Sequence, residues 1–133
     1  MQKSALIFFL LLFSFFLLVQ PSVAQAEPST KSKSPTVSAS VAKNRKSAYV
    51  TFSNLTSVKT VRYMFTYDSK GGPQGASGTI RLKSRTKTLS RRLLFGTCLK
   101  NVCTYHKNVT NIKLSVDFTL KSGGVVSFEK KLK

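Results

Sequence analysis

The segment from Ile112 to Leu120 alternates strictly between apolar and polar residues, and it constrains the fold more than any other part of the chain. Its apolar members are Ile112, Leu114, Val116, Phe118 and Leu120, and its polar members are Lys113, Ser115, Asp117 and Thr119. Successive side chains of a strand point to opposite faces of a sheet. The period of two therefore predicts a half-buried strand whose apolar face contributes to the core.

The same alternation recurs between turn residues from Thr36 onward, and no segment shows a helical period. Further strands are predicted at residues 37–41, 48–52, 61–67, 80–82, 89–95 and 126–132. The glycine- and proline-rich residues 69–75 predict a loop, and residues 121–124 predict a hairpin connection. About seven short strands in about a hundred residues indicate an all-β antiparallel sandwich, with an open barrel as the alternative.

The N-terminal residues have the three parts of a secretory signal peptide. A basic start is followed by an apolar run from Ala5 to Val19, and Ala24-Gln25-Ala26 is a small-residue cleavage site. An uncleaved membrane anchor is the alternative, but this run is shorter than the roughly 20 residues that a spanning helix needs. We expect residues 1–26 to be the signal peptide, residues 27–35 a flexible polar leader or a terminus without a role, and residues 36–133 the sandwich domain.

Cys98 and Cys103 are the only cysteines of the chain, and His106 is the only histidine. In an exported protein such a pair of cysteines predicts a disulfide. With His106 it could instead supply three ligands to zinc, but a structural zinc site normally has four, so no metal is predicted. The short closed loop is interpreted as a stabilising staple or as a contact surface. The candidate contact residues are Lys100, Asn101, Tyr105, His106 and Lys107.

The chain carries 22 basic and four acidic residues, a formal net charge of +18. The densest basic run is a candidate basic patch of Arg81, Lys83, Arg85, Lys87, Arg91 and Arg92. Such a charge attracts anionic polymers and headgroups without specifying one of them. The run contains no aromatic residue that could stack on single-stranded nucleic acid, so any nucleic-acid binding is expected to be nonspecific.

Acid–base catalysis needs paired carboxylates or a histidine held by one, and this chain has few such groups. If the last two strands pair, Asp117 and Glu129 come close together on an outer face, where we interpret them as solvated ion-pair partners. The protein is therefore predicted not to be an enzyme, and no catalytic residue or cofactor is predicted. The sequons at Asn54 and Asn108 leave glycosylation open.

Two segments resemble a known family. The residues AYVTFSN (Ala48–Asn54) and VRYMFTY (Val61–Tyr67), followed by the glycine-rich residues, resemble strands B and C of fibronectin type III domains. The resemblance implies an immunoglobulin-like sandwich used for adhesion or spacing, and it implies no functional residues because it concerns the fold alone.

Together these features predict an exported, strongly basic, non-catalytic binding or structural module, secreted or held at the cell surface. Its expected partners are anionic polymers or proteins of the cell envelope. The alternative is a soluble cationic effector that acts on anionic membranes or nucleic acid.

Overall fold

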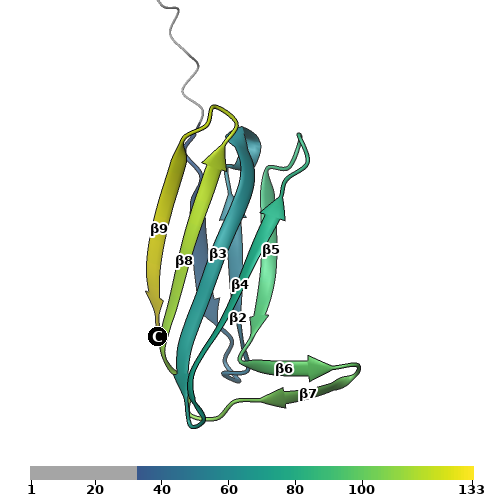
Figure 1. Ribbon diagram of the computed structural model, residues 1–133, viewed down its shortest axis with the longest axis vertical. Helices are drawn as coiled ribbons and strands as arrows, with labels where there is room; N and C mark the ends of the chain where they lie inside the picture. The colour runs from purple at the N-terminus through teal and green to yellow at the C-terminus, as the bar shows by residue number, and fades with distance from the viewer. Residues whose placement is uncertain (1–32) are drawn as a thin grey trace, which may run out of the picture. The chain divides into compact units, whose positions relative to one another are not determined.

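The computed structural model describes residues 33–133, and its regular elements are strands apart from one short 3-10 turn, η2 (Leu55–Ser57) (Figure 1). The strands are β1 (Thr36–Val41), β2 (Ser47–Ser53), β3 (Val58–Ser69), β4 (Gly72–Arg81), β5 (Thr88–Leu94), β6 (Gly96–Leu99), β7 (Val102–Tyr105), β8 (Thr110–Leu120) and β9 (Val125–Leu132). The predicted all-β class is confirmed. The expected signal peptide and most of the expected leader lie outside the described residues.

Seven of the strands form two antiparallel sheets. The three-stranded sheet has the order β1-β2-β5, and the four-stranded sheet has the order β4-β3-β8-β9. The chain changes sheet three times: between β2 and β3 through η2, between β4 and β5, and between β5 and β8 through β6 and β7. The remaining strands, β6 and β7, pair only with each other among the described residues.

The core lies between the two sheets and uses the faces that the alternation predicts. On β8 the side chains of Ile112, Leu114, Val116 and Phe118 are all buried. Phe52 of the three-stranded sheet meets Phe118 of the four-stranded sheet edge to face, with ring centroids 6.0 Å apart. Edge-to-face aromatic pairs contribute about 0.5–1.5 kcal/mol beyond the area they bury, so this contact helps to hold the sheets together.

Only Lys70 and Gly71 form a turn, because Ser69 belongs to β3 and residues 72–75 belong to β4, so the loop predicted for the whole of residues 69–75 is wrong. Ser69 of β3 pairs directly with Gly72 of β4, and Gly72 has a φ of +99° that suits glycine. Farther along β4, Gly78 lies opposite Tyr63, and a Cβ at Gly78 would stand 2.5 Å from the Tyr63 hydroxyl oxygen. A glycine in a strand can mark a close approach as well as a loop.

Candidate functional site

The segment around the two cysteines, predicted from the sequence as a short closed loop, is a β-hairpin. Figure 1 shows β6 and β7 projecting away from one end of the sandwich. Leu99 pairs with Val102, which leaves Lys100 and Asn101 as a two-residue turn. Every residue from 97 to 104 is exposed, so the hairpin adds no buried side chain to the core.

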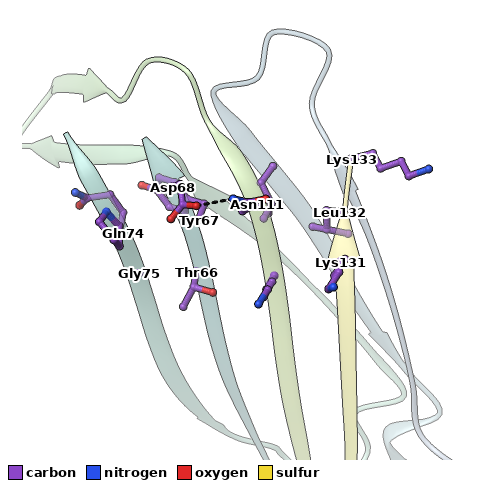
Figure 2. Close-up of a pocket in the computed structure, with 12 residues that line it drawn as sticks. Thr66, Tyr67, Asp68, Gln74, Gly75, Asn111, Lys131, Leu132 and Lys133 are labelled. Carbon is purple, nitrogen blue, oxygen red and sulfur yellow. Dashed lines mark hydrogen bonds between the residues drawn. The ribbon is translucent and has the colours of Figure 1, made fainter. Parts of the chain in front are cut away.

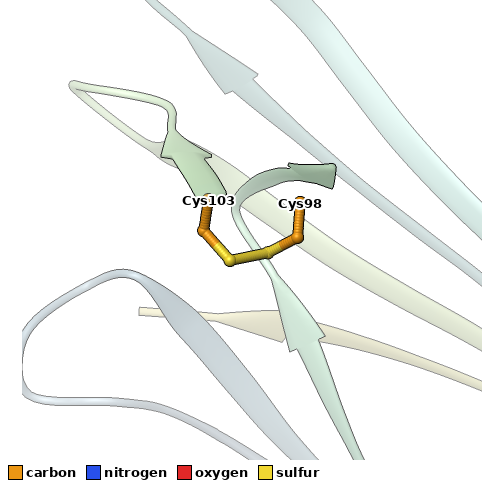
Figure 3. The surroundings of a disulfide bond; sticks show 2 residues. All are labelled: Cys98 and Cys103. Carbon is orange, nitrogen blue, oxygen red and sulfur yellow. A yellow bond between two sulfur atoms is a disulfide. The ribbon is translucent and has the colours of Figure 1, made fainter. Parts of the chain in front are cut away.

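The predicted disulfide is confirmed, and it joins directly opposed residues of the hairpin. Cys98 and Cys103 are register partners, with Cα atoms 4.0 Å apart (Figure 3). An isolated two-stranded hairpin is at best marginally stable in water. Closing so short a ring removes about 2 kcal/mol of chain entropy from the open state. The disulfide therefore stabilises a hairpin that gains no stability from burial in the core. It also leaves neither cysteine as a thiolate for a metal, and within residues 33–133 no three histidine, cysteine or acidic residues could hold one.

Gly96 allows the two strands of the hairpin to approach each other closely at its base. Its φ is +153°, and a Cβ at this position would collide with the carbonyl oxygen of Thr104. Immediately outside the hairpin, the His106 amide donates a hydrogen bond to the Phe95 carbonyl at 2.8 Å. Phe95 is itself fully buried, so the hairpin is rooted in the core at its base.

His106 belongs to this root and is only partly exposed. Its Nδ1 lies 3.0 Å from the hydroxyl oxygen of buried Tyr67. Burial raises the pKa of Tyr67, and a backbone hydrogen bond from Gly96 opposes that shift more weakly. The hydroxyl therefore stays protonated at neutral pH and can donate to Nδ1. His106 thus anchors the hairpin to β3.

The five predicted contact residues are split between the two ends of the hairpin. Lys100 and Asn101 lie at its turn, Lys107 is exposed beyond its base, and Tyr105 and His106 are half-buried. Lys46 places its Nζ 4.9 Å from the centre of the Tyr105 ring, a cation–π geometry. The contact surface expected from the sequence is therefore not one patch in the structure.

The sequence indicated residues 99–102 as the tip of the closed loop, but the expected contact residues did not include its two aliphatic side chains. Leu99 and Val102 are 79% and 72% exposed and are the most exposed large hydrophobic side chains in the described residues. The signal was present in the printed sequence, because each lies next to a cysteine in a loop too short to return to the core. We call Leu99, Lys100, Asn101 and Val102 the hairpin tip.

The candidate basic patch follows the rim between the two sheets. Arg81 is the last residue of β4, and Arg91 and Arg92 belong to the edge strand β5. The other three members, Lys83, Arg85 and Lys87, lie in the connection between these strands. All six are exposed, and the connection lies at the end of the sandwich opposite the hairpin (Figure 1).

The register of β5, ambiguous in the sequence, is settled by its pairing with β2. Leu93 is buried, and Arg91 shares its side of the strand but remains exposed. Arg92 belongs to the opposite face, where its guanidinium lies 5.8 Å from the Tyr49 ring centre and its Nε donates to Ser47 Oγ at 3.1 Å. Arg91 and Arg92, although adjacent in the chain, therefore lie on opposite faces of β5.

The acidic side chains of the described residues are Asp68, Asp117 and Glu129, and their strand positions assign all of them to the outer face of the four-stranded sheet. Asp117 accepts a hydrogen bond from Ser127 Oγ at 2.7 Å, and Asp68 accepts one from Asn111 Nδ2 at 2.6 Å. Glu129 lies opposite Ser115, so Asp117 and Glu129 are diagonal neighbours. The predicted proximity of these two residues holds, and neutral groups provide the hydrogen bonds to both aspartates.

A groove of about 950 Å³ opens on the same face near the ends of β3 and β8 (Figure 2). Lys113 and Lys131 line it and are direct register partners. Like charges directly opposite in a sheet are unfavourable. Asp68 also lines the groove and binds Asn111, as the dashed line in Figure 2 shows. The groove therefore mixes both signs of charge.

Comparison with known proteins gives no significant match, whether to a family model, to a curated protein or to a solved structure. Between residues 33 and 133 there is also no helix long and apolar enough to cross a membrane. A function must therefore be inferred from the residues and their geometry.

Proposed function

We propose that the protein is an exported, non-catalytic binding module that attaches to anionic polymers at a cell surface. The observation that carries this proposal is the segregation of charge. Residues 33–133 contain 20 of the 22 basic residues and only three acidic ones, and those three belong to one outer face. Elsewhere on the described surface no carboxylate side chain interrupts the basic residues.

This distribution favours a long flexible polyanion over a small acidic ligand. Basic residues occur on the rim of the basic patch, at the hairpin tip, in the β1–β2 turn and on β9. A polyanion that follows such a surface releases counterions at each contact, so many weak contacts add up to a useful affinity. The same mechanism makes the affinity fall steeply with salt.

The strand arrangement supports an immunoglobulin-like type for this module. It has seven strands in two antiparallel sheets, the number found in constant-type immunoglobulin domains. The two segments that resemble fibronectin type III strands are the second and third strands, and they belong to opposite sheets. In contrast to the constant-type order, β4 pairs with β3 and not with the sheet that holds β1. This is a fold-level likeness and names no ligand.

The test measures binding of the exported, processed protein to dextran sulfate, polyphosphate and neutral dextran across a salt series. We expect both polyanions to bind with an affinity that falls linearly on logarithmic axes, and neutral dextran not to bind. Changing the six patch residues to glutamine should make the slope of log affinity against log salt concentration shallower. A matched variant changes six basic residues elsewhere, Lys43, Lys70, Lys107, Lys113, Lys130 and Lys131.

Similar salt dependence in the two variants would mean that basic residues over the whole surface contribute to binding. A much larger loss of polyanion affinity in the patch variant would locate the contact at the basic patch. Equal binding of neutral dextran, or binding that ignores salt, would contradict the proposal. Release of dye from phosphatidylglycerol vesicles at the same protein concentrations would instead favour the cationic effector.

A further inference from the structure

The β6–β7 hairpin is ordered without contributing to the core. No residue from 97 to 104 is buried, a disulfide crosslinks the two strands, and Gly96 allows them to approach closely at the base. Folding of the two sheets does not require such a projection, because their core is complete without it. The disulfide and Gly96 therefore give a defined conformation to the exposed hairpin tip.

That tip combines two aliphatic side chains with a lysine. Leu99 and Val102 are direct register partners, and Lys100 and Asn101 form the turn between them. Lys100 has a φ of +54°, in the left-handed region that glycine and asparagine occupy more easily. The two-residue turn requires this positive φ at its first position, so the turn places the lysine at the outermost point of the hairpin.

The size and charge of the tip suit a lipid surface better than a protein surface. Stable protein interfaces bury about 1,200–2,000 Å² in total, far more than four residues at the end of a two-stranded hairpin supply. Interfacial membrane binding instead combines a small inserted apolar surface with attraction between basic residues and anionic lipid. Twenty basic residues against three acidic ones supply that attraction here.

We propose that the hairpin tip inserts into the headgroup region of an anionic lipid bilayer, with Leu99 and Val102 entering the apolar boundary and Lys100 contacting the anionic headgroups. This inference rests on the proposed function in one respect: the basic surface brings the domain to an anionic boundary. It goes further in naming lipid as a partner and the tip as the inserting element.

Tryptophan fluorescence can test insertion directly, because the chain contains no tryptophan. In Val102→Trp, the emission should shift to shorter wavelength when phosphatidylglycerol vesicles are added, because the indole leaves water. In the control Met64→Trp, at a side chain 57% exposed on the four-stranded sheet, the emission should not shift. Equal shifts in both proteins, or none in Val102→Trp, would overturn the proposal.

A second experiment compares two variants that keep every charge. Leu99→Ser/Val102→Ser removes the aliphatic pair of the tip, and Met64→Ser/Val125→Ser removes two exposed apolar side chains from the four-stranded sheet. Burying one aliphatic side chain changes an equilibrium constant by about tenfold or more. At high salt, we therefore expect the tip variant to bind phosphatidylglycerol vesicles at least about tenfold more weakly, and the sheet variant to bind like the parent.

Dextran sulfate binding by the same proteins separates failure of this inference from failure of the proposed function. The inference predicts equal binding of dextran sulfate by all three, because no charge is changed. If dextran sulfate binds but vesicle binding is the same in the tip variant and the parent, insertion is wrong and the polyanion function stands. If vesicles bind through the tip and no polyanion binds, the proposed function is wrong and insertion stands.

Discussion

Strand β8 and the β6–β7 hairpin are neighbours in the chain, yet they are held in place by different physical means. Four residues of β8 are buried, and the strand pairs with β3 on one side and β9 on the other. The hairpin has exposed residues on both of its faces and a covalent bond between its strands. Burial stabilises the first and a crosslink stabilises the second. Substitutions in the two regions should therefore differ in kind as well as in size.

The largest effect is expected for Leu114→Asp, which places a carboxylate between the sheets. An unpaired buried charge costs several kcal/mol, comparable with the whole stability of about 5–15 kcal/mol that small domains have. The variant should lack a cooperative melting transition, as measured by circular dichroism. Lys113→Asp, one residue along on the exposed face and directly opposite Lys131, is the matched control and should melt at least as high as the parent. A native-like melt for Leu114→Asp would break the assignment of the core face.

Cys98→Ser/Cys103→Ser should affect the hairpin much more than the sandwich. We expect amide-exchange protection to disappear in residues 97–104 and to persist in β8, because local openings need not involve the core. The global melting temperature should fall by less than about 5 °C, which corresponds to about 1 kcal/mol in a domain of this size. A loss of protection throughout β8 would show that the hairpin is part of the cooperative core.

Tyr67→Phe probes the root that joins the two regions, and its effect should be smaller than the local opening of the hairpin that loss of the disulfide causes. Removing the hydroxyl deletes the contact with His106 and should cost about 1 kcal/mol at neutral pH. The raised pKa of Tyr67 also gives a pH signature. Above pH 10.0 the Tyr67 hydroxyl of the unfolded chain loses its proton, whereas that of the folded protein keeps it up to a higher pH. The contribution of this group to the free energy of unfolding is therefore full below pH 10.0 and declines as the pH rises toward the pKa of the folded state.

Denaturant titrations of the parent and Tyr67→Phe between pH 8 and pH 11 can measure this dependence. The phenylalanine variant should lose less stability across the alkaline range than the parent. Parallel pH curves for the two proteins would contradict the assignment of the titrating group to Tyr67.

Much of the sandwich could be predicted because its signals are local. The alternation from Ile112 to Leu120 assigns each side chain to a face without knowledge of the partner sheet. The prediction failed where one residue type has two structural uses. The glycines of residues 69–75 were interpreted as a loop, although Gly72 and Gly75 lie in β4, and Gly75 packs closely against the backbone of Phe65. For the site, the disulfide was predicted, whereas the exposure of Leu99 and Val102 was not.

The sequence by itself determined which side chains of β8 face the core, the pairing of Cys98 with Cys103, and the excess of positive charge on the chain. Each follows from the order and number of residues alone. Only the tertiary structure decided that the acidic side chains share one outer face and that the aliphatic pair at the hairpin tip stays in water. Strand pairing joins residues far apart in the chain, and an apolar side chain is buried only where another layer covers it. Leu114 has such a layer above it, and Leu99 does not.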